Sequence, residues 1–162
     1  MIVVDLGCAP HGGVDSTAIL IKRFKPDRLY GFDPLAESGS GRDGDTTVLI
    51  FAGAAWTHDG AVLFQDDTVA SCIVTDEPEP VLHEAMRLDP KPARLVSCFD
   101  LASWLLRVRE RVILKMDIEG AEYTLLPRLI ETGAIALIDL LLIEWHWEPI
   151  EGLPCPVENW PH

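Results

Sequence analysis

The sequence predicts an α/β fold with a Rossmann-like, doubly wound and mostly parallel sheet. Apolar runs rich in strand-forming residues alternate with capped helical segments, which is the pattern of βαβ units. The predicted strands also end in acidic or small residues, as expected where a parallel sheet binds a ligand at its carboxyl edge. The chain has 162 residues, of which 48% are hydrophobic. We interpret it as one domain over 1–162 with an irregular, proline-rich tail at 147–162.

The first βαβ unit is predicted over residues 2–33. Its opening strand, IVVDL, leads into a glycine-rich turn over 7–13. Asp15 supplies a capping side chain for a helix over 18–24, which must end before the next proline. The second strand follows at 29–32. The spacing matches the length of about 30 residues that is typical of this unit.

The middle of the chain has fewer regular signals. Residues 34–45 are rich in Gly, Ser and Asp and predict a loop, whereas 46–56 predict one buried strand. The pair Asp59-Gly60 lies between two extended segments and predicts a β-hairpin. Between 66 and 94 we identify only a possible short helix over 81–87.

The last part of the chain again alternates helices and strands. Asp100 can cap a helix over 101–109, and 111–117 (RVILKMD) predict a buried strand. A helix is expected over 118–133, closed by its last glycine. The run over 134–146 is so uniformly apolar that we expect a central parallel strand covered on both faces.

Composition excludes several classes of function. The 26 acidic and 13 basic residues give a formal net charge of -13, which would repel a nucleic-acid backbone. No apolar run reaches the roughly 18 residues of a membrane-spanning helix, and the first residues lack a signal-peptide pattern. We therefore expect a soluble, cytoplasmic protein with neither a nucleic-acid nor a membrane partner. The four cysteines lack paired CxxC spacing and are interpreted as reduced thiols.

Acidic and small residues stand at five predicted strand ends. They are Asp5 with Gly7, Asp33, Gly53 to Ala55, Asp117 with Glu119, and Glu144 with His146. Because the carboxyl ends of parallel strands share one edge of the sheet, these residues are expected to meet at one site. A glycine turn lets a ligand approach the main chain, and Asp33 is placed to accept hydrogen bonds from ribose hydroxyls. We therefore expect a nucleoside ligand.

The details of the glycine turn narrow the choice of nucleoside. The sequence GCAPHG at 7–12 lacks the middle glycine of the dinucleotide fingerprint, which disfavours NAD. No Gly-Lys-Ser/Thr follows it, which disfavours a nucleoside triphosphate. Asp5 adds a negative charge to the opening strand, and this charge suits a cationic ligand such as a sulfonium or an ammonium.

Six segments together resemble the motifs of the FkbM-type S-adenosylmethionine-dependent methyltransferases. In chain order they are VVDLGCAPHGG, LYGFDP, AAWTHDGAVLF, SCFDLASWL, ILKMDIEGAEYTLLPRL and LLLIEWH. The most distinctive combination is LKMDIEGAE followed by an apolar strand that ends in Glu-x-His. The resemblance implies a class I methyltransferase fold, here apparently without its last strand pair. It also implies methyl transfer to a hydroxyl of a sugar, polyketide or other small metabolite.

The resemblance also assigns roles to individual residues. The methionine part of the cofactor would be held by Asp5, Gly7, Ala9 and Gly12. Asp33 would bind the ribose, Ala54 would lie near the adenine, and Asp117 would lie beside the methyl group and the acceptor.

Two alternatives for activating the acceptor hydroxyl remain open. Glu144 and His146 are expected to lie two apart on a strand and so to face the same side, and His146 is the candidate general base because an unperturbed imidazole has a pKa of about 6.5. Alternatively, Asp117, Glu119 and Glu144 gather a divalent cation that acidifies the hydroxyl. We favour the histidine and assign no metal ligand. Glu122 is interpreted as an ordinary acid of a first helical turn.

A second class of function also remains open. Because the expected last strand pair is missing, the chain is alternatively a non-catalytic or truncated cofactor-binding domain that acts with a partner. The apolar run over 134–146 would then be an exposed sheet edge, which native proteins cover or charge. We therefore expect a homo-oligomer or a partner chain.

Overall fold

The computed structural model describes four stretches of the chain, residues 1–10, 15–65, 72–75 and 93–146. Three predictions fall outside these stretches: the cofactor contact of Gly12, the short helix over 81–87 and the irregular tail over 147–162. No helix within the described stretches has the length and apolar character needed to cross a membrane.

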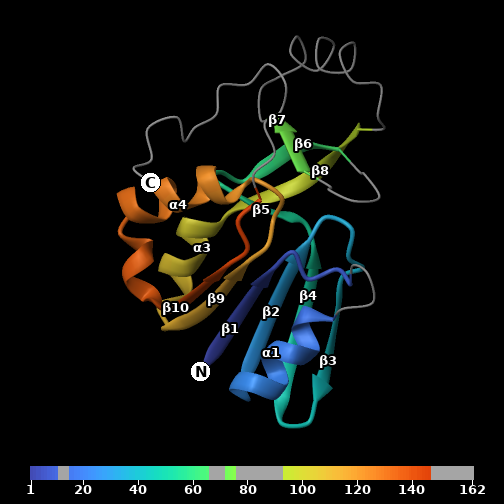
Figure 1. The fold of residues 1–162 in the computed structure, drawn as a ribbon, viewed down its shortest axis with the longest axis vertical. Helices are drawn as coiled ribbons and strands as arrows, with labels where there is room; N and C mark the ends of the chain where they lie inside the picture. The colour runs from blue at the N-terminus through green and yellow to red at the C-terminus, as the bar shows by residue number, and fades with distance from the viewer. Residues whose placement is uncertain (11–14, 66–71, 76–92, 147–162) are drawn as a thin grey trace.

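A six-stranded sheet forms the centre of the structure (Figure 1). Its strands are β1 (Ile2–Leu6), β2 (Arg28–Asp33), β3 (Gly39–Asp43), β4 (Thr46–Ala52), β9 (Val112–Met116) and β10 (Ile138–Ile143). Their spatial order is β10-β9-β1-β2-β4-β3, and every neighbouring pair is parallel except β3 with β4. The predicted α/β class with a mostly parallel sheet is confirmed.

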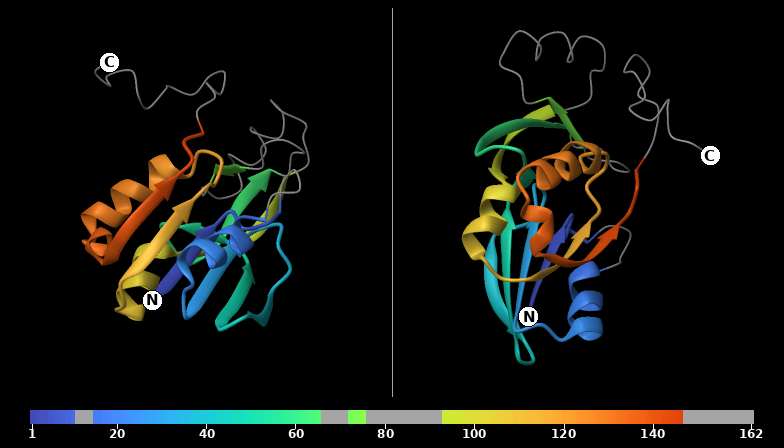
Figure 2. Two further views of the ribbon diagram at one scale, coloured as in Figure 1. Left: turned by 60° about the horizontal axis from the view of Figure 1, so that its bottom comes forward. Right: turned by 90° about the vertical axis from the view of Figure 1, so that its left-hand side faces the viewer.

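Helices cover both faces of this sheet (Figure 2). The described α-helices are α1 (Ser16–Phe24), α3 (Leu101–Val108) and α4 (Glu122–Glu131). Successive residues of β1 point to opposite faces. Val3 therefore shares a core cluster with Leu20 of α1, whereas Val4 shares another with Leu105 of α3 and Leu125 of α4.

The strand order places a crevice beside β1. From β1 the chain passes through α1 to β2 on one side, and it later returns to β9 on the other side of β1. Ligands of open α/β sheets bind outside the carboxyl ends of the strands at such a reversal of direction. The fold therefore points to the ends of β1, β2 and β9 as the place to search for a site.

A smaller sheet lies beyond the carboxyl edge of the main sheet (Figure 1). Its strands are β5 (Ala54–Trp56), β6 (Gly60–Gln65), β7 (Cys72–Thr75) and β8 (Ala93–Asp100), in the order β5-β8-β6-β7. Phe64 and Trp56 are buried in a cluster that also contains Ala121, which follows the end of β9. This small sheet therefore packs against the edge where the strand ends meet.

Two predictions for the middle of the chain are wrong. The supposed loop over 34–45 contains β3, which pairs antiparallel with β4 after a turn in which Gly44 has φ +56°. All five residues of β3 are exposed, so this strand lacks the alternating apolar residues by which a strand is usually recognised in a sequence. The supposed single strand over 46–56 is divided at Gly53, whose N–H donates to the Asp33 carbonyl, and its second part joins the other sheet.

The predicted hairpin at Asp59-Gly60 is also wrong. Strands β5 and β6 do not pair with each other, because both pair with β8, on its opposite edges. The side chain of Asp59 instead accepts a hydrogen bond from the Asp100 N–H at 3.0 Å. At the Asp-Gly pair the chain thus passes from one edge of β8 to the other.

The last predicted helix and strand are both shorter than expected. Residues 118–121 form a turn in which Glu119 and Gly120 have φ values of +53° and +97°, so α4 begins only at Glu122. Residues Ala134–Leu137 form a 3₁₀ helix, and β10 is the outermost strand of the main sheet in the described part of the chain.

The expectation that this last strand is central and covered on both faces is wrong. Leu140 is 40% exposed, and Asp139 of the same strand is exposed and forms an ion pair with Arg111, which precedes β9. Charged side chains of this kind are a common protection of exposed sheet edges. The association with a partner at this edge stays a prediction.

The position of Gly7 yields a stability prediction. Its φ is +76°, and a Cβ there would lie 1.8 Å from the Asp117 carbonyl oxygen. We expect Gly7→Ala to lower the free energy of unfolding by more than about 2 kcal/mol, because backbone strain adds to a clash with main chain. Urea denaturation measures the change.

Gly44→Ala is the matched control. Gly44 also has a positive φ, but the space where its Cβ would lie is open. Only the backbone cost of about 1–2 kcal/mol is expected there. Equal losses in the two variants would contradict the close approach of Gly7 to Asp117.

Candidate functional site

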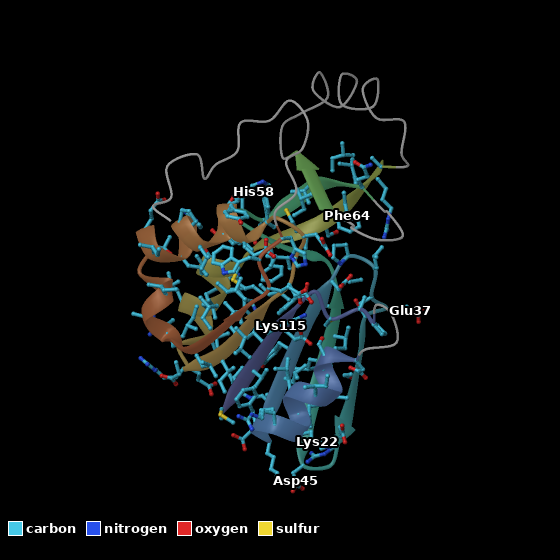
Figure 3. The ribbon with its side chains drawn as sticks, viewed as in Figure 1. Lys22, Glu37, Asp45, His58, Phe64 and Lys115 are labelled. Carbon is cyan, nitrogen blue, oxygen red and sulfur yellow. The ribbon has the colours of Figure 1, made fainter. Side chains whose placement is uncertain are left out.

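A cavity of about 310 Å³ lies where the strand ends of the main sheet meet the smaller sheet. Its volume lies at the lower end of the range for small-molecule sites. Its walls include residues from all five predicted strand ends, among them Gly7, Ala9, Asp33, Gly53, Ala54, Asp117, Glu119 and Glu144. The predicted convergence of these residues is confirmed. Phe64 and Ile73 line the cavity from the smaller sheet (Figure 3 labels Phe64).

The turn after β1 forms one wall of the cavity. The Gly7 N–H donates to the Phe32 carbonyl at 2.9 Å, and the Asp117 N–H donates to the Leu6 carbonyl at 3.2 Å. These bonds join the ends of β1, β2 and β9. The positive φ of Gly7 and its close approach to Asp117 explain why only glycine fits at this position.

Asp33 lies at the end of β2, 5% exposed. Its Oδ2 accepts a hydrogen bond from the Ala9 N–H at 2.9 Å, and its Oδ1 accepts one from the Leu35 N–H at 2.7 Å. Each carboxylate oxygen has a second acceptor position. Asp33 is thus fixed by the main chain and still able to bind hydroxyls of a ligand.

Lys115 is a central cation of the site that the sequence analysis missed (Figure 3). Its Nζ lies 3.2 Å from Asp5 Oδ1 and 3.0 Å from Asp117 Oδ2, and it donates to the Gly7 carbonyl at 2.9 Å. One ammonium thus holds two carboxylates and the glycine turn together. A lysine within the apolar run RVILKMD was the signal available in the sequence.

Asp5 is buried beneath the cavity and does not line it. Its Oδ2 accepts hydrogen bonds from the hydroxyls of Ser16 at 2.8 Å and Thr17 at 3.0 Å, at the start of α1. Burial raises the pKa of Asp5, and the charge of Lys115 opposes this shift. Asp5 therefore fixes α1 and Lys115 to β1 and has no direct path to a ligand in the cavity.

Cys8 is a buried thiol in the same turn. Burial, and then the charges of Asp5 and Asp33, raise its pKa to about 12. The thiol is therefore protonated at neutral pH and is no nucleophile.

His146 lies beside the cavity, after the end of β10. The prediction that Glu144 and His146 lie on the strand is wrong, because β10 ends at Ile143. Its Nε2 is 3.5 Å from Asp117 Oδ1, 3.6 Å from Glu119 Oε1 and 3.9 Å from Glu144 Oε1. Its Nδ1 lies 3.3 Å from Glu122 Oε1. The structure therefore brings together Asp117, Glu144 and His146, the three residues predicted for the acceptor side.

Glu122 lies in the first turn of α4, as predicted, but it is not an ordinary surface acid, because it is fully buried. Its carboxylate accepts hydrogen bonds from the N–H groups of Ile118 at 2.9 Å and Gly120 at 2.8 Å. A carboxylate only accepts, so a hydrogen bond between His146 and Glu122 requires a proton on Nδ1. In the neutral tautomer that makes this bond, the lone pair on Nε2 faces Asp117 and Glu119.

The charges around the cavity favour a cationic ligand. Asp33, Asp117, Glu119 and Glu144 line it, and Lys115 already neutralises Asp5 and one oxygen of Asp117. An anionic ligand would meet mainly carboxylates. A positively charged group therefore fits better.

Comparison with known proteins identifies no relative of this chain. No protein-family model matches the chain, and neither the curated proteins nor the solved structures give a match. The functional argument therefore rests on the geometry of the site.

The burial of Asp5 beside Lys115 yields a second prediction. We expect Lys115→Met to lower the free energy of unfolding at neutral pH by about 3–5 kcal/mol, because it leaves a buried carboxylate without its counter-charge. Lys22→Met is the control, since Lys22 is exposed and lies at the far end of the main sheet (Figure 3).

The loss of unfolding free energy in Lys115→Met should depend on pH. A carboxyl whose pKa is raised by folding contributes stability below its ordinary pKa of 3.8, and this contribution is lost as pH rises through the folded-state value. Removing Lys115 raises that pKa further. The destabilisation should therefore grow from about pH 4 to about pH 7 in denaturation experiments. A loss that is constant over this range would contradict the ion pair with Asp5.

Proposed function

We propose that the protein binds S-adenosylmethionine and transfers its methyl group to a hydroxyl oxygen of a small molecule. The observation that carries this proposal is that one cavity is lined by the Gly7 turn, Asp33 and Asp117 together. A cofactor-binding domain without catalytic activity is the alternative, and the turnover experiment below separates the two.

Three features support a nucleoside cofactor. The cavity lies at the reversal of strand order beside β1, where α/β folds bind nucleotides. Asp33 has acceptor positions left for the two ribose hydroxyls. Ala54, which is 4% exposed, adds a small side chain to the wall at which a flat base could lie.

The acidic walls support a sulfonium in preference to a pyrophosphate. A phosphate group would need cations or free N–H groups near the Gly7 turn. The Ala9 N–H is already bonded to Asp33, and Lys115 is bonded to Asp5 and Asp117. This arrangement, together with the resemblance of the motifs, makes a class I methyltransferase of the FkbM type the family that we propose.

The proposed reaction needs few groups from the protein. The acceptor oxygen forms a bond to the methyl carbon while the electron pair of the S–C bond returns to sulfur, and the hydroxyl proton is released. Because the sulfonium already activates the methyl group, alignment of the two reactants can supply about 7 kcal/mol or more of the barrier reduction. Asp117, Glu144 and His146 would orient the hydroxyl and assist loss of its proton.

The first test is ligand binding. We expect calorimetry to show binding of S-adenosylmethionine and of its demethylated product, and none of NAD. Asp33→Ala should weaken binding by about 1–3 kcal/mol, because the ribose hydroxyls lose a charged acceptor. Asp45→Ala is the control, since Asp45 is exposed at the opposite end of the main sheet (Figure 3). Tight binding of NAD with no response to S-adenosylmethionine would overturn the proposal.

The second test is turnover. In an assay with a panel of small hydroxylated acceptors, we expect Asp117→Asn and His146→Ala to lower kcat by about 100-fold. The Kd of S-adenosylmethionine should change much less, because both residues lie on the acceptor side. His58→Ala is the matched control for the histidine.

The outcome separates the two candidate functions. Unchanged turnover in both variants would contradict the role of the acceptor-side residues. Binding of S-adenosylmethionine without turnover of any acceptor would favour the cofactor-binding domain.

A further inference from the structure

We propose that Asp117, Glu119 and His146 form a binding site for one divalent first-row metal ion. Each of them offers one ligand atom, and these atoms all lie within 4.8 Å of one another. All three side chains are partly buried, so they are not an ordinary exposed acidic surface. Asp117 directly follows β9, Glu119 lies in the turn after it, and His146 lies after the end of β10.

The distances fit a shared ion better than direct hydrogen bonds. Nε2 of His146 lies 3.5 Å from Asp117 Oδ1 and 3.6 Å from Glu119 Oε1. Hydrogen bonds from nitrogen to oxygen are usually about 2.7–3.2 Å long. Ligand atoms that each lie about 2.1 Å from one ion are about 3–3.5 Å apart in octahedral or tetrahedral geometry.

Glu122 fixes the imidazole from outside this group. It is fully buried, it is held by two main-chain N–H groups, and it faces Nδ1 of His146. The Nε2 lone pair is therefore directed toward Asp117 and Glu119. Histidine ligands of metal ions almost always have such a partner on the second nitrogen.

Lys115 orients Asp117, the second proposed metal ligand, in the same way. It binds Oδ2 of Asp117, and this leaves Oδ1 facing His146. Glu144 Oε1 adds a further carboxylate 3.9 Å from Nε2. Mutual repulsion of these carboxylates would be relieved by a doubly charged cation.

The ligand set indicates the class of ion. One imidazole nitrogen with carboxylate oxygens suits Mn²⁺, Fe²⁺ or Zn²⁺, whereas Ca²⁺ prefers oxygen ligands alone. Asp117 and Glu119 also line the cavity, so open coordination positions would face it. In a part of the inference that rests on the proposed function, a hydroxylated acceptor would bind there and its hydroxyl would become more acidic.

Titration with Mn²⁺ alone, followed by the electron paramagnetic resonance signal of the free ion, tests the site. We expect one Mn²⁺ per chain, with an affinity that excess Ca²⁺ does not abolish. His146→Ala and Asp117→Asn should each weaken binding at least tenfold. Glu122→Gln should weaken it by about 10–100-fold although it removes no ligand.

Two controls keep the test interpretable. His58→Ala should bind Mn²⁺ like the unchanged protein, and circular dichroism should show that each variant is folded. If Glu122→Gln fails to fold, Glu119→Gln tests the ligand set instead: it removes one ligand carboxylate from a partly exposed turn and should weaken Mn²⁺ binding at least tenfold.

The possible results decide the proposal clearly. Absence of saturable Mn²⁺ binding at millimolar concentration, or binding unaffected by both His146→Ala and Asp117→Asn, would overturn it. Calorimetry with S-adenosylmethionine on the same preparations is independent of this result. Failure of the cofactor to bind would therefore refute the proposed function and leave the metal site standing.

Discussion

The structure of the site depends on one partly buried ammonium group, that of Lys115. Lys115 joins Asp5, Asp117 and the Gly7 carbonyl, and so connects β1 to β9 at their carboxyl ends. Asp5 is fully buried in the innermost strand, where an unpaired carboxylate would be costly. Because Lys115 supplies the counter-charge and the hydroxyls of α1 satisfy the other oxygen, the sheet tolerates an acid there. The same ammonium group also fixes the glycine turn through the Gly7 carbonyl.

The ion pair between Lys115 and Asp117 also determines how the side chains of Asp117 and His146 are oriented. Lys115 holds one oxygen of Asp117, so the other faces His146, whose second nitrogen is held by Glu122. Glu122 in turn binds the main chain of the turn between β9 and α4. Asp117 and His146 follow the ends of strands, and ion pairs together with main-chain hydrogen bonds of Glu122 fix their positions.

Local signals in the sequence predicted much of this arrangement. Contacts between residues far apart in the sequence could not be predicted. Asp15 and Asp100 accept from main-chain N–H groups at the starts of α1 and α3 as predicted, because capping depends on near neighbours. The pairing of β5 and β6 with β8 could not be predicted from the sequence, since β8 lies more than 25 residues farther along the chain. Lys115 and Glu122 were missed for a similar reason: their decisive partners, Asp5 and His146, are far away in sequence.

The strand order divides the site into two halves that meet at Asp117. Gly7, Ala9 and Asp33 come from the β1 and β2 side, and Glu144 and His146 come from the β10 side. In the proposed reaction these halves hold the cofactor and the acceptor respectively, so the methyl group would pass between them beside Asp117. The smaller sheet lines the same cavity with Phe64 and Ile73, which are apolar. In the proposed reaction these apolar side chains would displace water from one wall of the cavity and strengthen the charge interactions there, so the small sheet would contribute to the chemistry as well as to the fold.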